Sequence, residues 1–125
     1  MNPTQLPLLV EGILILIAGT FGFILGRAGR PYGKVKLAVH LFFVLWFAVG
    51  YGFIAYAILT KGSATMGILV PVTVMGLAIL TQLVTGILML ASKKAEKAIP
   101  KIHIVSASLL VASDICAFFM AGLRP

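Results

Sequence analysis

Four long apolar runs, separated by short polar segments, make up most of the chain. They cover residues 8–26, 37–60, 66–91 and 102–122. Each run is close to the roughly 20 residues that cross about 30 Å of hydrocarbon as a helix rising about 1.5 Å per residue. Because backbone N–H and C=O groups must be satisfied inside lipid, such runs form helices. The pattern predicts an all-α integral membrane protein, with a single domain over residues 1–125.

Composition and loop length agree with this prediction. Of the 125 residues, 61% are hydrophobic and 10% are charged, which lies outside the range of a soluble domain. The short connections favour an up-and-down four-helix bundle with antiparallel neighbours. The first run follows no basic segment and contains Glu11, so we expect a retained helix and not a cleaved signal peptide.

The net charge of +7 is concentrated in two connections. Segments 27–36 and 92–101 each contain four Lys or Arg residues, whereas the remaining two basic residues are Lys61 and Arg124. The positive-inside rule therefore predicts that loops 27–36 and 92–101 are cytoplasmic and that both termini lie outside. We expect a multi-pass protein of a prokaryotic plasma (inner) membrane, whose basic residues contact membrane lipid and no nucleic acid.

The chain has only two histidines, and they occupy matching positions. His40 and His103 each lie just inside an apolar run, directly after a basic loop. Their helices run in the same direction, so both imidazoles lie at one depth and can face each other across the bundle. Two neutral imidazoles on opposed helices can bind one haem iron from both sides. We therefore predict His40 and His103 as the axial ligands of a single haem b.

Residues near the depth of the histidines suit a haem pocket. Glycines leave room for a flat cofactor, and basic side chains can bind its propionates. The glycines are Gly19, Gly22, Gly26 and Gly86, and the basic residues are Arg27, Arg30, Lys36 and Lys101. Ordinary helix packing is an alternative explanation of the glycines, since small residues let membrane helices approach closely.

The histidines also have alternative explanations. They could be interfacial side chains that contact headgroups or cap the loops. Zinc fits less well, because it normally takes four ligands and no Cys, Asp or Glu lies at that level within the spans. Further along, Thr81 and Thr85 are expected to bond back to their own helix, and the amide of Gln82 needs a partner within the bundle.

A second polar layer lies further along the same helices. Tyr51 follows His40, and Asp114 follows His103, by the same interval of 11 residues, or about 16 Å of helix. Glu11 of the first run belongs to this layer. Ionisable groups in a bilayer cost roughly 2.5 to 3.5 kcal/mol each, so they usually face the protein interior. We predict a quinone site, where Glu11 or Asp114 accepts quinol protons and Tyr51 bonds a ring oxygen; the alternative is that both acids simply lie near the interface.

The segment Gln82-Leu83-Val84-Thr85-Gly86-Ile87-Leu88, the basic loop after it and Ile102-His103-Ile104 resemble the small membrane b-type cytochromes, including cytochrome b561-like domains. In that family a helix ending in glycine and a short loop precede a haem-ligating histidine. The resemblance covers mainly the second to fourth helices and depends on histidine placement. It implies His40 and His103 as axial ligands, and electron transfer with a quinone or a partner redox subunit.

The chain also departs from that family. Two-haem members carry a second histidine roughly three to four turns further along such helices, where this chain has Tyr51 and Ile54, or Asp114 and Ala117. Only one haem can therefore be held by a pair of histidines. A single haem near one membrane face needs a quinone or a partner subunit to complete an electron path.

Two functions of other classes remain open. One is a small proton-coupled multidrug-type transporter that uses Glu11, although Asp114 adds a second acid and the aromatic and proline signals of such exporters are not evident around residues 51–71. The other is a cofactor-free membrane anchor subunit of a larger complex. Because the chain lacks a nucleophile constellation, a nucleotide loop and a cysteine cluster, we expect an electron-transfer subunit of an oxidoreductase complex, or a homodimer, and not an enzyme by itself.

Overall fold

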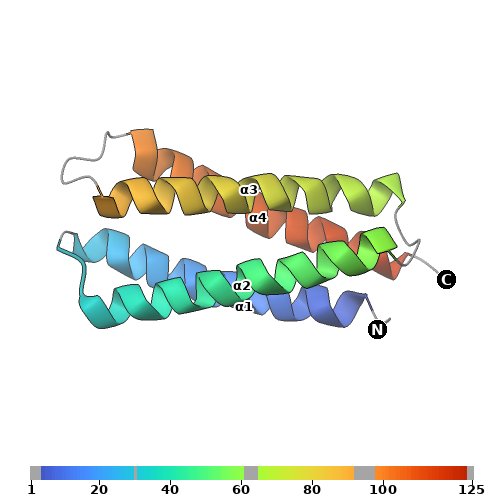
Figure 1. Ribbon diagram of the computed structural model, residues 1–125, viewed down its shortest axis with the longest axis horizontal. Coiled ribbons are helices and arrows are strands. Elements are labelled where there is room, and N and C mark those ends of the chain that lie inside the picture. The colour runs from blue at the N-terminus through green and yellow to red at the C-terminus, as the bar shows by residue number, and fades with distance from the viewer. Residues whose placement is uncertain (1–3, 30, 61–64, 92–97, 124–125) are drawn as a thin grey trace.

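The computed structural model is a bundle of long antiparallel helices (Figure 1). It describes residues 4–29, 31–60, 65–91 and 98–123. In chain order the helices are α1 (Gln5–Ala28), α2 (Lys34–Thr60), α3 (Met66–Ala91) and α4 (Ala98–Gly122). All four are long and apolar enough to cross a membrane. The prediction of an all-α, membrane-spanning four-helix bundle is confirmed.

The helices extend beyond the apolar runs at the end where the basic residues lie. Helix α2 begins at Lys34, and α4 begins at Ala98, a few residues before the apolar runs that predicted them. Long basic side chains permit this, because their heads reach the headgroup region while their stems lie along apolar surface. Helix α1 ends before Gly29, whose φ of 72° is a conformation that glycine adopts without strain.

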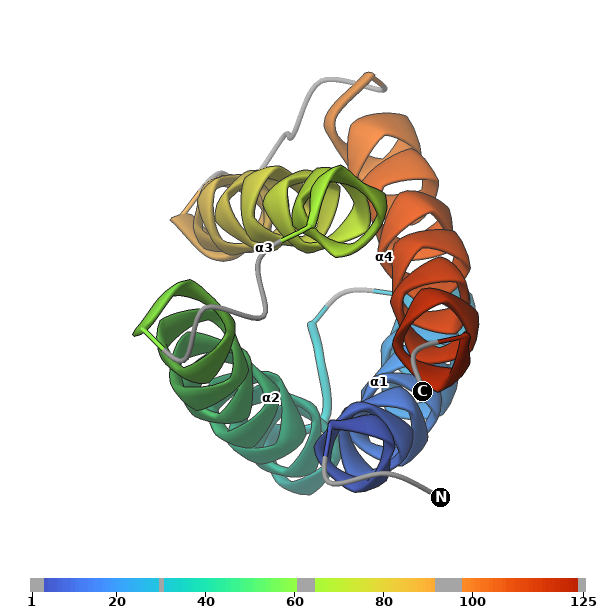
Figure 2. The same cartoon turned by 90° about the vertical axis from the view of Figure 1, so that its right-hand side faces the viewer.

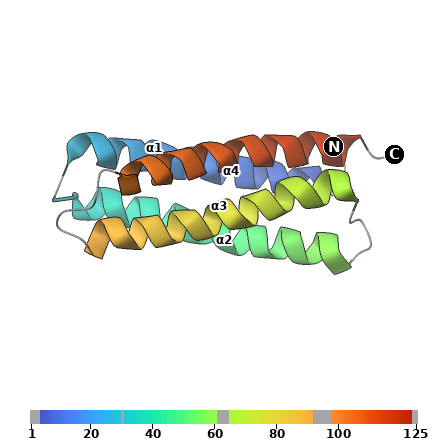
Figure 3. The ribbon, with the colours of Figure 1, turned by 90° about the horizontal axis from the view of Figure 1, so that it is seen from above.

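The helices form two hairpins that pack side by side. The closest packing is within α1/α2 and within α3/α4, and α1 joins α4 along the bundle; of the adjacent helices, α2 and α3 approach each other least. Figure 2 looks along the bundle and shows α2 diagonally across from α4. Figure 3 shows that α1 begins and α4 ends at the same end of the bundle. The opposite end is called the histidine end below, because the first turns of α2 and α4 lie there.

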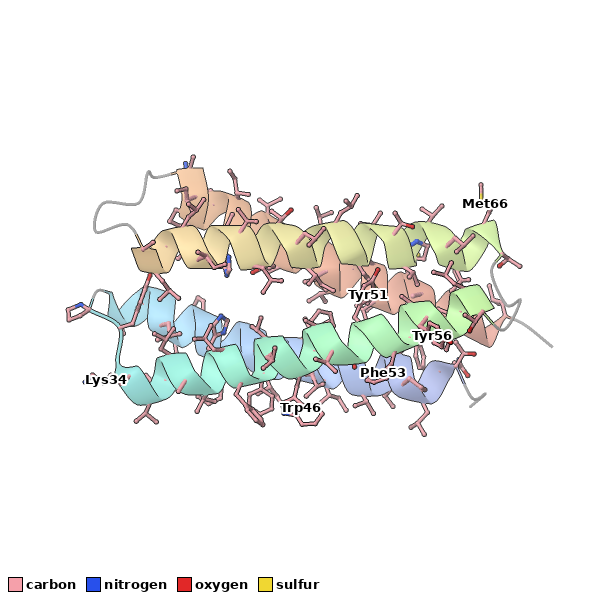
Figure 4. The ribbon with its side chains drawn as sticks, in the orientation of Figure 1. Lys34, Trp46, Tyr51, Phe53, Tyr56 and Met66 are labelled. Atoms are coloured by element: carbon pink, nitrogen blue, oxygen red, sulfur yellow. The ribbon has the colours of Figure 1, made fainter. Side chains whose placement is uncertain are left out.

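Large apolar side chains cover both the inside and the outside of the bundle. Leu8, Met75 and Ala117 are fully buried, whereas Trp46 and Phe53 are largely exposed and point away from the bundle (Figure 4). An apolar exterior is what lipid contact requires. Residues 30 and 92–97 of the two basic loops lie outside the described residues, and the cytoplasmic placement of those loops stays a prediction.

Candidate functional site

His40 is held by the preceding helix. Its Nδ1 lies 2.8 Å from the carbonyl oxygen of Ala18 on α1. A carbonyl only accepts, so Nδ1 carries the proton and donates this hydrogen bond. The ring lies against bare backbone, since a Cβ added at Gly22 would be 3.0 Å from the His40 Cε1. In the neutral ring, Nε2 therefore keeps its lone pair.

His103 is held in the same manner by α3. Its Nδ1 lies 2.7 Å from the Oγ1 of Thr85, a buried residue. The Thr85 hydroxyl donates its own proton to the carbonyl of Thr81, at 2.6 Å. Thr85 Oγ1 must therefore accept from the Nδ1–H of His103, and Nε2 of this ring also keeps its lone pair. Gly86 lies beside the ring, with a Cβ added there 3.7 Å from Cε1.

The two hairpins thus present their histidines in equivalent ways. In each, the ring lies near a glycine of the preceding helix and Nδ1 donates to that helix. His40 and His103 stand on the diagonal helices α2 and α4, near the starts of these helices at one end of the bundle. Within the described residues neither Nε2 makes a hydrogen bond. Metal-binding histidines usually show this pattern, because the bonded nitrogen fixes the tautomer and the ring orientation.

Gln82 supports the backbone around His103. Its Nε2 donates to the His103 carbonyl at 2.6 Å and to the Ser106 Oγ at 3.0 Å. The Ser106 hydroxyl in turn donates to the same carbonyl, also at 3.0 Å. The sequence indicated that Gln82 needs a partner, and Thr85 does bond back to its own helix as expected. Sequence reasoning missed Ser106, and it missed that Thr85 also accepts from His103.

The glycines predicted to line a pocket fall into two groups. Gly22 and Gly86 lie beside the histidine rings. Gly19 and Gly26 are exposed, and a Cβ added at either would meet nothing within 4 Å. The structure therefore brings two of the four predicted glycines to the histidines.

The predicted propionate ligands are also divided. Arg27, Lys36 and Lys101 are exposed at the histidine end, and Arg30 lies outside the described residues. The Arg27 guanidinium carbon is 5.8 Å from the centroid of the exposed Phe23 ring, so Arg27 packs along the surface of α1. Lys36 is one turn before His40 on nearly the same helix face, because residues four apart share a face.

Glu11 and Asp114 lie inside the bundle, at the end away from the histidines. They are only 4% and 5% exposed. The Glu11 carboxyl occupies the space that a side chain at Gly50 would need, and Asp114 Oδ2 is 2.7 Å from a Cβ added at Gly12. One oxygen of each carboxyl, Glu11 Oε2 and Asp114 Oδ1, is buried without a hydrogen-bond partner. Sequence reasoning placed both acids in this layer, but it did not find Gly12 and Gly50.

Tyr51 bridges two helices. It points toward α3 (Figure 4), and its hydroxyl donates to the carbonyl of Val72 at 2.7 Å. Gly76 makes room for the phenol, since a Cβ added there would be 2.5 Å from the hydroxyl oxygen. A quinone oxygen would have to compete with Val72 for the Tyr51 proton. The structure therefore gives Tyr51 a hydrogen-bond partner of its own, and among the described residues its hydroxyl makes no hydrogen bond to either carboxyl.

No protein family, no curated protein and no solved structure matches this chain. The fold defines a multi-pass membrane protein.

Proposed function

We propose that this protein is a membrane b-type cytochrome, which binds one haem between His40 and His103 and transfers electrons between a quinone pool and a partner redox subunit. The observation that carries the proposal is the shared state of the two rings. Each donates from Nδ1 to a neighbouring helix and keeps the Nε2 lone pair. The hydrogen bond on one nitrogen orients an imidazole and raises the basicity of the other, which is what an axial ligand needs.

The residues suit a haem better than a bare metal ion. Two imidazoles on opposite sides are enough for a six-coordinate haem, because the porphyrin supplies the other ligands. Zinc takes three or four ligands from the protein. Among the described residues, no three His, Cys, Asp or Glu side chains form a group that could hold a metal ion.

The chain's part in the reaction is to bind and insulate the cofactor. When bound, the haem supplies one-electron chemistry, and the protein tunes it through the ligands, their hydrogen bonds and burial. Lys36 is the basic residue best placed for a propionate, with Lys101 and Arg27 exposed at the same end. The resemblance to small b-type cytochromes supports the same role, and the charge pattern supports a prokaryotic inner membrane with the histidine end toward the cytoplasm.

A reduced-minus-oxidised absorption spectrum of the full chain, purified from haem-replete cells, tests the proposal. We expect a b-type spectrum with one haem per chain. His40→Ala and His103→Ala should each abolish the low-spin bis-histidine spectrum. Ser108→Ala is a matched control on α4, because Ser108 is exposed and bonds only to the carbonyl of Ile104 on its own helix. Absence of a b-type band in the wild type, or an unchanged band in both histidine variants, would rule the proposal out.

A proton-coupled transporter that uses Glu11 is the second candidate. It is favoured by the burial of this carboxyl and by its unpartnered Oε2. Vesicles containing the wild type would then take up a lipophilic cation in response to a pH gradient, and Glu11→Gln would not. If the protein binds no haem and drives no uptake, the cofactor-free anchor subunit is the remaining function.

A further inference from the structure

Two carboxyl groups from different helices lie in the bundle interior at the end away from the histidines. Glu11 comes from α1 and Asp114 from α4, and both are more than nine-tenths buried. Each has a buried oxygen that no hydrogen bond satisfies. The Asp114 carboxyl also lies against α1 directly beside Glu11, because its Oδ2 is 2.7 Å from a Cβ added at the next residue, Gly12.

The described structure offers these carboxyls no compensating positive charge. The described basic residues, Arg27, Lys34, Lys36 and Lys101, all belong to the histidine end. Helix α3 contains no titratable residue. Helix α2 contributes Tyr51, whose proton is donated to Val72, and the exposed Tyr56. The only other titratable side chain in this half of α4 is the exposed Cys116.

Two carboxylate charges are not stable in the bundle interior without a compensating positive charge. An isolated ion loses much of its solvation free energy when it is buried in a protein or inserted into a membrane. Two carboxylates that share an apolar site also repel each other, so one of them keeps a proton. Protonation of one carboxylate removes its negative charge and creates an O–H donor. The buried carboxyl oxygens otherwise have no such donor as a partner.

We propose that Glu11 and Asp114 form a proton-binding site within the membrane, which retains at least one proton at neutral pH. The ligand is the proton itself. One of the two carboxyls holds it as a neutral carboxylic acid, and the other carboxyl is its neighbour. Gly12 and Gly50 make the site possible, because the carboxyls occupy the space that side chains at these positions would need. The site does not require a haem. If the proposed electron-transfer function holds, this is where protons released by a quinol would be received.

Infrared spectroscopy of the full chain in lipid nanodiscs tests this inference. The C=O stretch of a protonated carboxyl is distinct from carboxylate bands and shifts in D2O. We expect such a band in the wild type at neutral pH, and its loss as the pH rises. The double variant Glu11→Gln/Asp114→Asn should lack it. In Glu11→Gln alone, the band of Asp114 should disappear at lower pH than the wild-type band, because the repelling neighbour is gone.

The sequence supplies a matched control. It contains three acidic residues, and the third, Glu96, lies outside the described residues in a lysine-rich segment. Glu96→Gln should leave the band unchanged. A wild type without a protonated carboxyl at neutral pH would overturn the inference, as would a band that survives in the double variant or is removed by Glu96→Gln. The titration of the wild-type band tests the proton-binding site even if a variant misfolds. The haem spectrum reports separately on the proposed function.

Discussion

Nδ1 of His103 donates to the hydroxyl of Thr85 on the neighbouring helix, across 2.7 Å. His40 makes the corresponding bond to a backbone carbonyl, that of Ala18. The two rings are therefore oriented by groups of different kinds. A substitution can remove the acceptor of His103, whereas no substitution can remove that of His40. A substitution at Thr85 can therefore perturb His103, a proposed axial ligand, without replacing it.

Thr85→Val is expected to weaken haem binding without abolishing it. Valine keeps the shape of threonine but cannot accept the Nδ1 hydrogen bond. Loss of such a supporting bond typically costs about 10-fold to 100-fold in metal affinity. The haem midpoint potential and the electron paramagnetic resonance spectrum should change with it, which a purely structural residue would not cause.

Thr81→Val is the matched control for that experiment. Thr81 is a partly buried residue one turn away on α3, and its hydroxyl bonds only to the carbonyl of Leu77, at 2.9 Å. We expect the wild-type affinity and potential in this variant. Equal effects of the two substitutions would show that Thr85 does not position His103.

Gly22→Ala should displace His40. Its Cβ would lie 3.0 Å from the ring, and the ring cannot move away without lengthening its bond to Ala18. Overpacking of this kind typically costs about 1 to 3 kcal/mol. Gly19→Ala, three residues earlier in the same helix, meets nothing within 4 Å and should be tolerated. Thermal unfolding and haem retention measure both effects, and similar losses in the two variants would contradict the packing of His40 on Gly22.

The sequence predicted the helices and the polar layers, but not the contacts between helices. Each helix is long and apolar by itself, so its existence does not depend on its neighbours. The contacts depend on how each helix is rotated, and a chain that is apolar all round carries little periodic signal for that rotation. For this reason Gly22 could not be distinguished from Gly19, nor Thr85 from Thr81.

Tyr51→Phe should loosen the packing of α2 on α3. These are the adjacent helices that approach each other least, and the hydroxyl of Tyr51 bonds across them to Val72. Polar bonds between membrane helices contribute about 0.6 kcal/mol on average and at most about 1.7 kcal/mol. We expect a loss in this range on unfolding in mixed micelles, with the haem spectrum unchanged. Tyr56→Phe, on an exposed residue of the same helix, should have no effect; equal stabilities of all three proteins would show that the bond contributes nothing.

Gly50→Ala should force the Glu11 carboxyl out of its position. The added Cβ would take the place of a carboxyl oxygen of Glu11. We expect a loss of about 1 to 3 kcal/mol in the free energy of unfolding, the usual range for overpacking. Combining Gly50→Ala with Glu11→Ala should recover part of that loss, because the clash is then absent. Residues in contact typically show coupling of about 0.5 to 3 kcal/mol in such a cycle.

Gly52→Ala is the control for this cycle, since a Cβ there meets nothing within 4 Å. It should cost nothing by itself, and its effect should add to that of Glu11→Ala without coupling. Additive behaviour of Gly50→Ala and Glu11→Ala would mean that the Glu11 carboxyl does not lie against Gly50. The carboxyl would then be free to turn toward the headgroups, and the reason for a proton to remain on the pair would be lost.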